Sequence, residues 1–328
     1  MMQEAKGDTQ VAHPWVADGL RNVRVGVQFL DDCADWTQYL DYAQLVEELG
    51  FDSLWIADHP MIATDCWTTL AALAVSTRRI RLGSLVSCIY YRNPALLARI
   101  AAEVDRLSKG RLILGLGIGD IPFEFAQMGL PFPSARERLE TLEEVIHVVK
   151  GVWDTTPFTY KGKYVQVQQA QLPFGPVQQP YVPMLIAGGG ERGTLRLVAQ
   201  YADASNFGAH VFTGGASRVE DVVRKCDVLR SHCDMLERPV NSILRTHITL
   251  PLVLGETPSA IAAKHEVVPT MLREMFQSSA VAVTPREAIA YYRALIQAGM
   301  QYFIIGTWPN DVETLQLFSQ QVVPTLTC

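Results

Sequence analysis

The chain has 328 residues, of which 48% are hydrophobic and 19% charged, and its formal net charge is −6. This composition favours a folded protein with a sizeable core, and an acidic balance without a Lys/Arg block argues against a nucleic-acid surface. No stretch approaches the roughly 18 apolar residues of a membrane span, and residues 1–17 contain no apolar signal segment. We therefore expect a cytoplasmic protein that acts on a small molecule, with no nucleic-acid or membrane partner.

Residues 1–22 are expected to form a flexible leader, and strand and helix patterns alternate after it. Apolar runs predict eight strands, at 23–29, 53–57, 80–86, 112–116, 184–187, 204–207, 242–250 and 302–305. Helical patterns follow them, at 37–49, 67–77, 94–107, 135–153, 194–201, 218–236, 285–298 and 312–323. This alternation predicts an α/β fold, a (β/α)8 TIM barrel, as a single domain over residues 23–328.

Two segments exceed a simple barrel, at 155–183 after strand four and at 251–283 after strand seven. Long insertions in barrels often carry function, so we expect both to wall the substrate cavity, with residues 159–164 forming a hairpin. Surface decoration is the alternative interpretation. The six cysteines have no C-x-x-C spacing, which favours free thiols over a disulfide framework or a metal site.

The most informative stretch is 80–120, which reads as strand, loop, helix and second strand. Such a βαβ unit requires parallel strands, whose chemistry lies at their carboxyl ends. One of these ends carries Ser84-Leu85-Val86-Ser87, and the other carries three glycines followed by Asp120. The glycines, among them Gly117, would let a planar ligand approach the backbone. Asp120 could bond that ligand or move a proton, or could merely cap a turn.

Asp58-His59 directly follows the second predicted strand, which places both side chains at the catalytic rim. A histidine there is a candidate acid or base because its pKa lies near physiological pH. A structural role is the alternative.

Gly188-Gly189-Gly190 begins a G-x-G-x-x-G pattern between the fifth strand and its helix. A Rossmann fingerprint belongs to the first βαβ unit of an open sheet, so we do not interpret this pattern as one. Free amides at a helix N-terminus bind phosphate in any fold, which predicts a phosphate clamp; a flexible turn is the alternative. The sequence has no H-E-x-x-H, P-loop or G-x-S-x-G motif, and we predict no metal site.

Several segments together resemble the luciferase-like flavin and deazaflavin oxidoreductases, especially the branch that depends on coenzyme F420. The resemblance is carried over about residues 24–207 by Arg24-Val-Gly-Val-Gln28, Gly50-Phe-Asp-Ser-Leu-Trp-Ile-Ala-Asp-His59, Arg92-Asn-Pro-Ala-Leu-Leu-Ala98, Leu107-Ser-Lys-Gly-Arg-Leu-Ile-Leu-Gly-Leu-Gly117, Gly188-Gly-Gly190 and Tyr201-Ala-Asp-Ala-Ser-Asn206. The resemblance implies a cofactor ring across the strand ends and its phosphate near Gly188, Gly189 and Gly190. It also implies a non-proline cis peptide, placed by alignment at Ser84–Leu85.

The resemblance also assigns roles to single residues. Asp58 and Ser87 would bond the cofactor, and Ser84 and Leu85 would form a bulge behind its ring. His59 would be the acid or base on the substrate side. Asp120 stands where some F420-using relatives have glutamate, and its shorter side chain weakens a direct contact with the ring. Phe125 replaces a histidine of many relatives, which suggests an apolar substrate wall.

We therefore predict hydride transfer between coenzyme F420 and a small organic substrate. An FMN-dependent monooxygenase that uses reduced flavin and O2 is the alternative, and a non-catalytic flavin-binding protein is an alternative of another class. The resemblance further implies a homodimer, and a flavin or F420 reductase could supply electrons.

Overall fold

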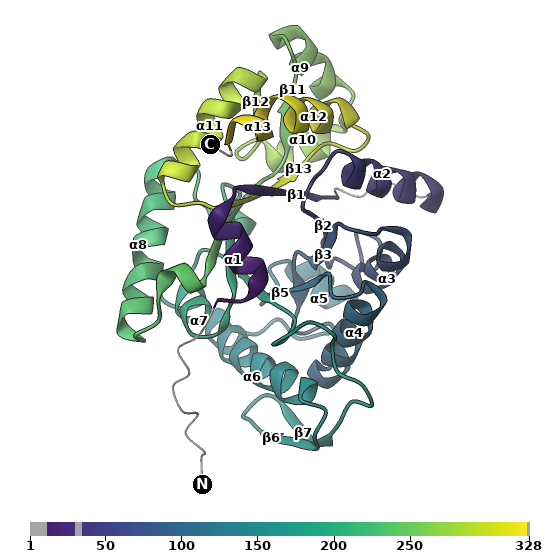
Figure 1. Cartoon of the computed structure of the whole chain (residues 1–328), viewed down its shortest axis with the longest axis vertical. Coiled ribbons are helices and arrows are strands. Elements are labelled where there is room, and N and C mark those ends of the chain that lie inside the picture. The colour runs from purple at the N-terminus through teal and green to yellow at the C-terminus, as the bar shows by residue number, and fades with distance from the viewer. Residues whose placement is uncertain (1–11, 30–34, 327–328) are drawn as a thin grey trace.

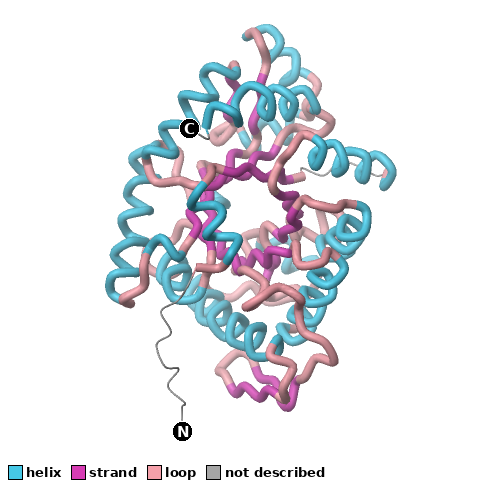
Figure 2. Tube along the Cα trace, in the orientation of Figure 1, coloured by secondary structure: helices cyan, strands magenta, loops and turns pink. Residues whose placement is uncertain are grey.

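The computed structural model describes residues 12–29 and 35–326, and its centre is a ring of parallel strands enclosed by helices (Figures 1 and 2). The strands are β1 (Arg24–Gln28), β2 (Ser53–Ile56), β3 (Arg81–Ser84) with its short continuation β4 (Ser87–Cys88), β5 (Leu112–Gly117), β8 (Met184–Ala187), β9 (Ala204–Gly208), β10 (Leu244–Thr249) and β13 (Tyr302–Gly306). They pair in the order β3-β2-β1-β13-β10-β9-β8-β5, and a further pairing of β3 with β5 closes the ring. The predicted (β/α)8 barrel is confirmed.

The surrounding helices are α2 (Trp36–Glu48), α3 (Cys66–Ser76), α4 (Pro94–Leu107), α6 (Ala135–Trp153), α7 (Thr194–Tyr201), α8 (Val219–Met235), α11 (Pro285–Gln297) and α12 (Val312–Leu317). A π-helical turn, Phe318–Val322, and α13 (Val323–Leu326) follow α12. Helix α11 begins with a capping box in which Thr284 and Glu287 each bond the other's backbone N–H. The helices pack their apolar faces against the outside of the ring. This packing forms the larger of the two main cores.

The Trp55 side chain fills the part of the barrel interior that lies next to two strand glycines, Gly26 and Gly83. A Cβ atom on Gly26 would lie 2.5 Å from Trp55 Nε1, and one on Gly83 would lie 2.3 Å from Trp55 Cε3. Both distances are too short for a real contact, so these two glycines create the space that the Trp55 indole occupies. The barrel therefore has a packed interior, and the open end for a ligand lies beyond the carboxyl ends of the strands.

Part of the expected leader is a structural element. Residues 1–11 lie outside the described part, but Pro14–Arg21 form helix α1 with Trp15 and Val16 fully buried. The Trp15 ring lies edge-on against Tyr302, and Arg24 Nη2 donates to the Trp15 carbonyl oxygen at 2.6 Å. Tyr302 and Arg24 begin their strands, so α1 closes the amino-terminal end of the barrel (Figure 2). The expectation of flexibility is wrong for this helix, because its apolar side chains complete the barrel core.

Additional elements lie between β5 and β8 and between β10 and β13. The first group contains α5 (Pro122–Gln127), which precedes the barrel helix α6, and a hairpin of β6 (Phe158–Lys161) and β7 (Gln166–Ala170), which projects beyond the helices (Figure 1). The second contains β11 (Leu252–Leu254), α9 (Pro258–Glu266), α10 (Thr270–Phe276) and β12 (Val281–Val283), with β11 and β12 paired in parallel. Within the described residues, no helix is both long and apolar enough to span a membrane.

The thiols of Cys66, Cys88, Cys226 and Cys233 are free and buried, whereas Cys33 and Cys328 lie outside the described residues. No group of three potential metal-ligating side chains occurs in the part of the chain that the structure describes.

His247 on β10 should make the protein sensitive to mild acid. Its side chain is buried on the helix-facing side of the strand, and burial lowers its pKa to about 4. A histidine in the unfolded chain has a pKa near 6.5, so below that pH the unfolded state takes up a proton that the folded state does not. The contribution of the neutral, buried His247 to stability is therefore complete above pH 6.5 and is lost as the pH falls toward 4. By pH 5 the loss amounts to about 2 kcal/mol of unfolding free energy.

We expect His247→Leu to remove this contribution. Urea unfolding measures the free energy of unfolding at pH 7 and at pH 5, and the decrease between the two should be about 2 kcal/mol smaller in the variant than in the wild type. His147→Gln, at an exposed histidine of α6, is the control for loss of a histidine as such. An equal drop in wild type and His247→Leu would contradict the prediction.

Candidate active site

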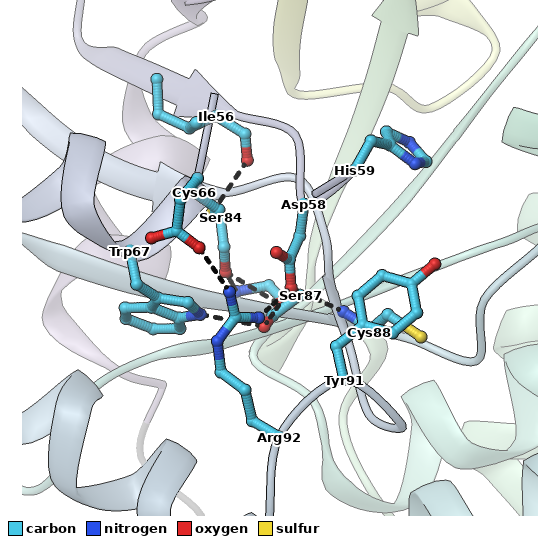
Figure 3. Close-up of polar contacts among 12 residues, drawn as sticks. Ile56, Asp58, His59, Cys66, Trp67, Ser84, Ser87, Cys88, Tyr91 and Arg92 are labelled. Atoms are coloured by element: carbon cyan, nitrogen blue, oxygen red, sulfur yellow. Dashed lines mark hydrogen bonds and ion pairs between the residues drawn. The ribbon is translucent and has the colours of Figure 1, made fainter. Parts of the chain in front are cut away.

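Asp58 lies at the centre of a buried polar cluster just beyond β2 (Figure 3). Its Oδ2 atom accepts hydrogen bonds from Ser87 Oγ at 3.0 Å, the Cys88 backbone N–H at 3.2 Å and Arg92 Nη1 at 2.6 Å. Burial raises the Asp58 pKa, and the Arg92 guanidinium opposes this effect. The other carboxylate oxygen, Oδ1, is buried and has no partner among the described residues. It is a free acceptor for a ligand that brings its own donor.

Ser84 and Ser87 are fully buried and use their hydroxyl groups within the protein. Ser84 Oγ bonds the backbone of Gly115 on β5, at 2.9 Å to its oxygen and 3.0 Å to its nitrogen. Ser87 Oγ donates to Asp58 and accepts from Trp67 Nε1 at 3.2 Å. Ser87 thus orients Asp58, and Ser84 joins two neighbouring strand ends.

The non-proline cis peptide lies at Leu85–Val86, so the placement at Ser84–Leu85 was wrong by one bond. The Leu85 N–H still continues the sheet by donating to the Ile56 oxygen at 2.7 Å, and pairing resumes only at Ser87 opposite Leu116. The irregular backbone is therefore confined to the bonds after Leu85. Leu85 and Val86 pack on the barrel's interior core.

His59 forms an ion pair with a carboxylate that sequence reasoning did not select. Its Nδ1–H donates to Glu124 Oε2 at 2.8 Å, and the Glu124 side chain is completely buried while that of His59 is 29% exposed. Burial by itself lowers the His59 pKa, but the hydrogen bond and charge of Glu124 outweigh this effect and raise it. The bond on Nδ1 leaves Nε2 as the atom that can exchange a proton with a substrate.

Two further groups surround this pair. The Tyr91 hydroxyl donates to Glu124 Oε2 at 3.3 Å, which fixes the carboxylate from a second side. Asp120 is exposed, yet partial removal of water and then the Glu124 charge raise its pKa. The Asp120 charge in turn helps to raise the pKa of His59. Asp120 therefore belongs to the electrostatic surroundings of His59.

Phe125 is buried rather than exposed on a substrate wall. Its ring contacts those of Tyr90, Tyr91 and Phe132, at centroid distances of 5.7, 5.4 and 4.9 Å. The expected apolar wall is therefore wrong at this residue, because the short helix α5 turns Phe125 into the protein. Its packing supports Tyr91, which bonds Glu124.

Gly117 ends β5 beside the irregular backbone. A Cβ atom there would lie 2.5 Å from Val86 Cγ2, so only glycine lets the two strand ends approach this closely. Gln28 ends β1 on the inner face of the barrel, two residues after Gly26, and its buried Oε1 has no partner among the described residues. A second free acceptor therefore lies at the barrel mouth.

The glycine loop after β8 has free backbone donors. Gly188 N–H bonds the Asn206 oxygen at 2.8 Å, but the N–H groups of Gly189 and Gly190 find no acceptor among the described residues. The buried Lys225 of α8 donates from Nζ to the Gly189 oxygen at 2.6 Å. The loop thus combines free amides, the start of α7 and a nearby ammonium group, which suits an anion.

Sequence reasoning missed Glu124, Arg92, Lys225 and Gln28 as members of this site. A signal existed for Glu124, since a carboxylate stands between two phenylalanines right after the glycine-rich strand end. The other three gave no local signal, because their roles depend on contacts between distant segments.

The site is an acid–base pair at the carboxyl end of a barrel, beside free acceptors and an anion-binding loop. The profile of the luciferase-like monooxygenases matches residues 18–316, and the chain belongs to that family. This finding confirms the resemblance seen in the sequence.

Relatives of this chain carry the names of F420-dependent enzymes. It is 28% identical over 321 residues to a protein of Amycolatopsis mediterranei named F420-dependent glucose-6-phosphate dehydrogenase, covering 88% of this chain and 93% of that protein. The structure of the coenzyme F420-dependent tetrahydromethanopterin reductase from Methanopyrus kandleri has a TM-score of 0.79 at 22% identity, covering 93% of this chain and 100% of that one. An F420-dependent secondary alcohol dehydrogenase has the same TM-score at 20% identity, covering 94% of this chain and 100% of that one. At these identities the two structures show a shared fold.

Proposed function

We propose that the protein is an oxidoreductase that transfers hydride between coenzyme F420 and a small organic substrate. The observation that carries the proposal is the His59–Glu124 pair, a proton-exchanging group held by a buried carboxylate at the carboxyl end of the barrel. The F420-dependent names of the relatives support the choice of cofactor.

The donors and acceptors of the site fit such a cofactor. F420, when bound, supplies a deazaflavin ring whose C5 carbon gives or takes a hydride. Asp58 Oδ1 would accept from an N–H or hydroxyl group of the cofactor, and Gly117 would let the strand end pack closely against Val86 behind its ring. Gly189 and Gly190 would bind the phosphate through their free amides, with Lys225 holding the loop in place. Gly188 supports the turn, because its φ of 119° belongs to the region that favours glycine.

His59 would transfer the proton that accompanies the hydride. Because Glu124 raises the pKa of His59, the imidazole holds its proton more firmly than a free histidine and can act as an acid, or as a base once it is neutral. Glu124 and Tyr91 orient the ring from behind, and Asp120 adds negative charge that stabilises the protonated form. The protein's other tasks are to orient the substrate and to keep water out.

An FMN-dependent monooxygenase is the alternative, favoured by the description of the family as monooxygenases. Titration of the purified protein with F420 and with FMN, followed by fluorescence, separates the two. We expect stoichiometric binding of F420 with at least about tenfold lower Kd than for FMN, a difference of 1.4 kcal/mol. Tighter binding of FMN would overturn the proposal in favour of the monooxygenase.

We also propose that residues 23–328 act as one luciferase-like domain in a cytoplasmic homodimer. Buried free thiols support a reducing compartment, and the exposed apolar side chains Val75 on α3 and Leu96 on α4, two helices in contact, offer a surface for a second copy. A separate flavin or F420 reductase would supply electrons if the protein uses the reduced cofactor.

A further inference from the structure

A cavity outside the candidate active site lies between helix α6, strand β6 and the segment that leads into β8; we call it the α6 cavity. Its volume is about 600 Å³, which is within the range of small-molecule sites. Helix α6 runs back from the carboxyl end of β5 toward the start of β8, so its last turns lie near the amino-terminal end of the barrel. His59 lies at the opposite end, and the residues that line the α6 cavity are all distinct from those of the candidate active site. The cavity is therefore a separate place for a ligand.

One wall of the α6 cavity is a row of three nearly parallel rings. The Phe158 and Tyr160 rings of β6 have centroids 6.4 Å apart and planes 13° apart. The Tyr160 ring continues the row to His147 of α6, at 6.0 Å and 17°. The hairpin packs closely on the helix at Gly151, where a Cβ atom would collide with the Phe158 ring. Aromatic rings prefer such near-parallel neighbours, so this wall favours a planar aromatic ligand.

Lys150 supplies the one Lys or Arg side chain in the lining of the cavity, one helical turn after His147. Its Nζ atom donates to the Tyr201 oxygen at 3.0 Å and lies 5.4 Å from the centre of the Tyr181 ring. The other two N–H bonds of the ammonium group have no acceptor among the described residues, and no carboxylate there forms an ion pair with it.

The charge of Lys150 is costly to the fold as it stands. Removal of water lowers the Lys150 pKa, and the charge of Asp203 opposes this effect only in part. A covered ammonium group is normally paired with a carboxylate, which Lys150 lacks. Asp154 also lines the cavity, but its side chain is exposed, so water screens its charge more than that of Lys150. The cavity therefore suits a ligand that brings one negative charge.

We propose that the α6 cavity is a second, non-catalytic site that binds a planar aromatic carboxylate. The aromatic ring of the ligand stacks on the row formed by Phe158, Tyr160 and His147. Its carboxylate accepts hydrogen bonds from the two free N–H groups of Lys150, and such charge-assisted bonds are among the strongest that proteins form. The site does not depend on the proposed function.

A ligand in this cavity would touch a side chain that is tied to the barrel. The Tyr181 hydroxyl donates to Asp203 Oδ1 at 2.9 Å, and Asp203 Oδ2 accepts from the Met184 backbone N–H at 2.8 Å, where β8 begins. A ligand that binds the folded chain alone raises its stability, so the melting temperature should rise with ligand concentration.

The test is a calorimetric titration of 2-naphthoate into the full-length protein, with and without F420. We expect a Kd that F420 leaves unchanged, and at least about tenfold weaker binding of the uncharged 2-naphthylmethanol. Lys150→Met should raise the Kd for 2-naphthoate by at least about tenfold, because it removes the ammonium group. Lys161→Met is the matched control, since Lys161 is an exposed lysine of β6 outside the cavity lining, and its Kd should stay within about twofold of the wild type.

Three results would overturn the inference: no binding of 2-naphthoate, equal affinity for 2-naphthylmethanol, or an equal Kd in Lys150→Met and Lys161→Met. Competition with F420 would place the ligand in the candidate active site and would also overturn it. Circular dichroism establishes that both variants are folded.

Hydrogen–deuterium exchange of the wild type tests the location without any substitution. Bound 2-naphthoate should slow exchange in residues 158–161 and 178–181 and leave residues 84–92 unchanged. Protection confined to residues 84–92 would contradict the proposed site.

Discussion

Replacing His59 with glutamine should lower the F420-linked turnover number by about 100- to 10,000-fold, because glutamine keeps a polar side chain but cannot exchange a proton. The Kd for F420 should stay within about threefold of the wild type, since Asp58 and the glycine loop do not depend on the imidazole. Steady-state kinetics and a fluorescence titration measure the two quantities. Unchanged turnover would exclude His59 as the acid or base, and absence of turnover in both proteins would favour a non-catalytic flavin-binding protein.

Glu124→Gln distinguishes the proton chemistry from a purely structural role of this pair. In the direction of substrate oxidation His59 must be neutral to accept a proton, so kcat/KM should rise with pH through the raised pKa of His59. Without the Glu124 charge that pKa falls, and the rise should move to lower pH. A loss of activity that is equal at every pH would show that Glu124 only supports the fold.

Trp15→Ala should lower the free energy of unfolding by about 3–5 kcal/mol, the typical cost of truncating a fully buried tryptophan. The change opens a cavity at the amino-terminal end of the barrel and removes the contact with Tyr302. Urea unfolding at pH 7 measures the effect. F420 affinity of the folded variant should not change, because the site lies at the other end of the strands.

Trp36→Ala is the matched control for Trp15→Ala, since the Trp36 side chain is 43% exposed on α2. We expect a loss below about 1 kcal/mol there. A similarly small loss in Trp15→Ala would show that α1 contributes little to the stability of the barrel.

The strands and the end of the barrel that carries the candidate site could be predicted, because both follow from local sequence patterns. Continuous apolar runs reveal strands that are covered on both faces, and the residues directly after such runs must lie at one end of the barrel. Asp58, His59 and Asp120 were found in this way. The flexible leader was a wrong prediction over Pro14–Arg21, because the eight residues of α1 are too few to show a clear helical period, although Trp15 and Val16 are fully buried.

The partners within the site could not be predicted because they join segments that are far apart in the chain. Glu124 reaches His59 across 65 positions, and Lys225 reaches Gly189 across 36. Which face a short helix such as α5 presents depends on packing and not on its six residues alone. The cis peptide was placed by alignment with the resembling family, and that alignment was wrong by one bond.

Phe276 belongs to the packing of both the barrel interior and the insertion between β10 and β13, so one side chain joins the stability of the two. Phe212 and Met271 are exposed, so substitutions at these positions should leave both cores intact. A substitution of Phe276 by a small residue removes contacts from two cores at once, so it should lower the melting temperature more than a change at either exposed position. The insertion is therefore coupled to the barrel through its packing and cannot be exchanged as an independent module.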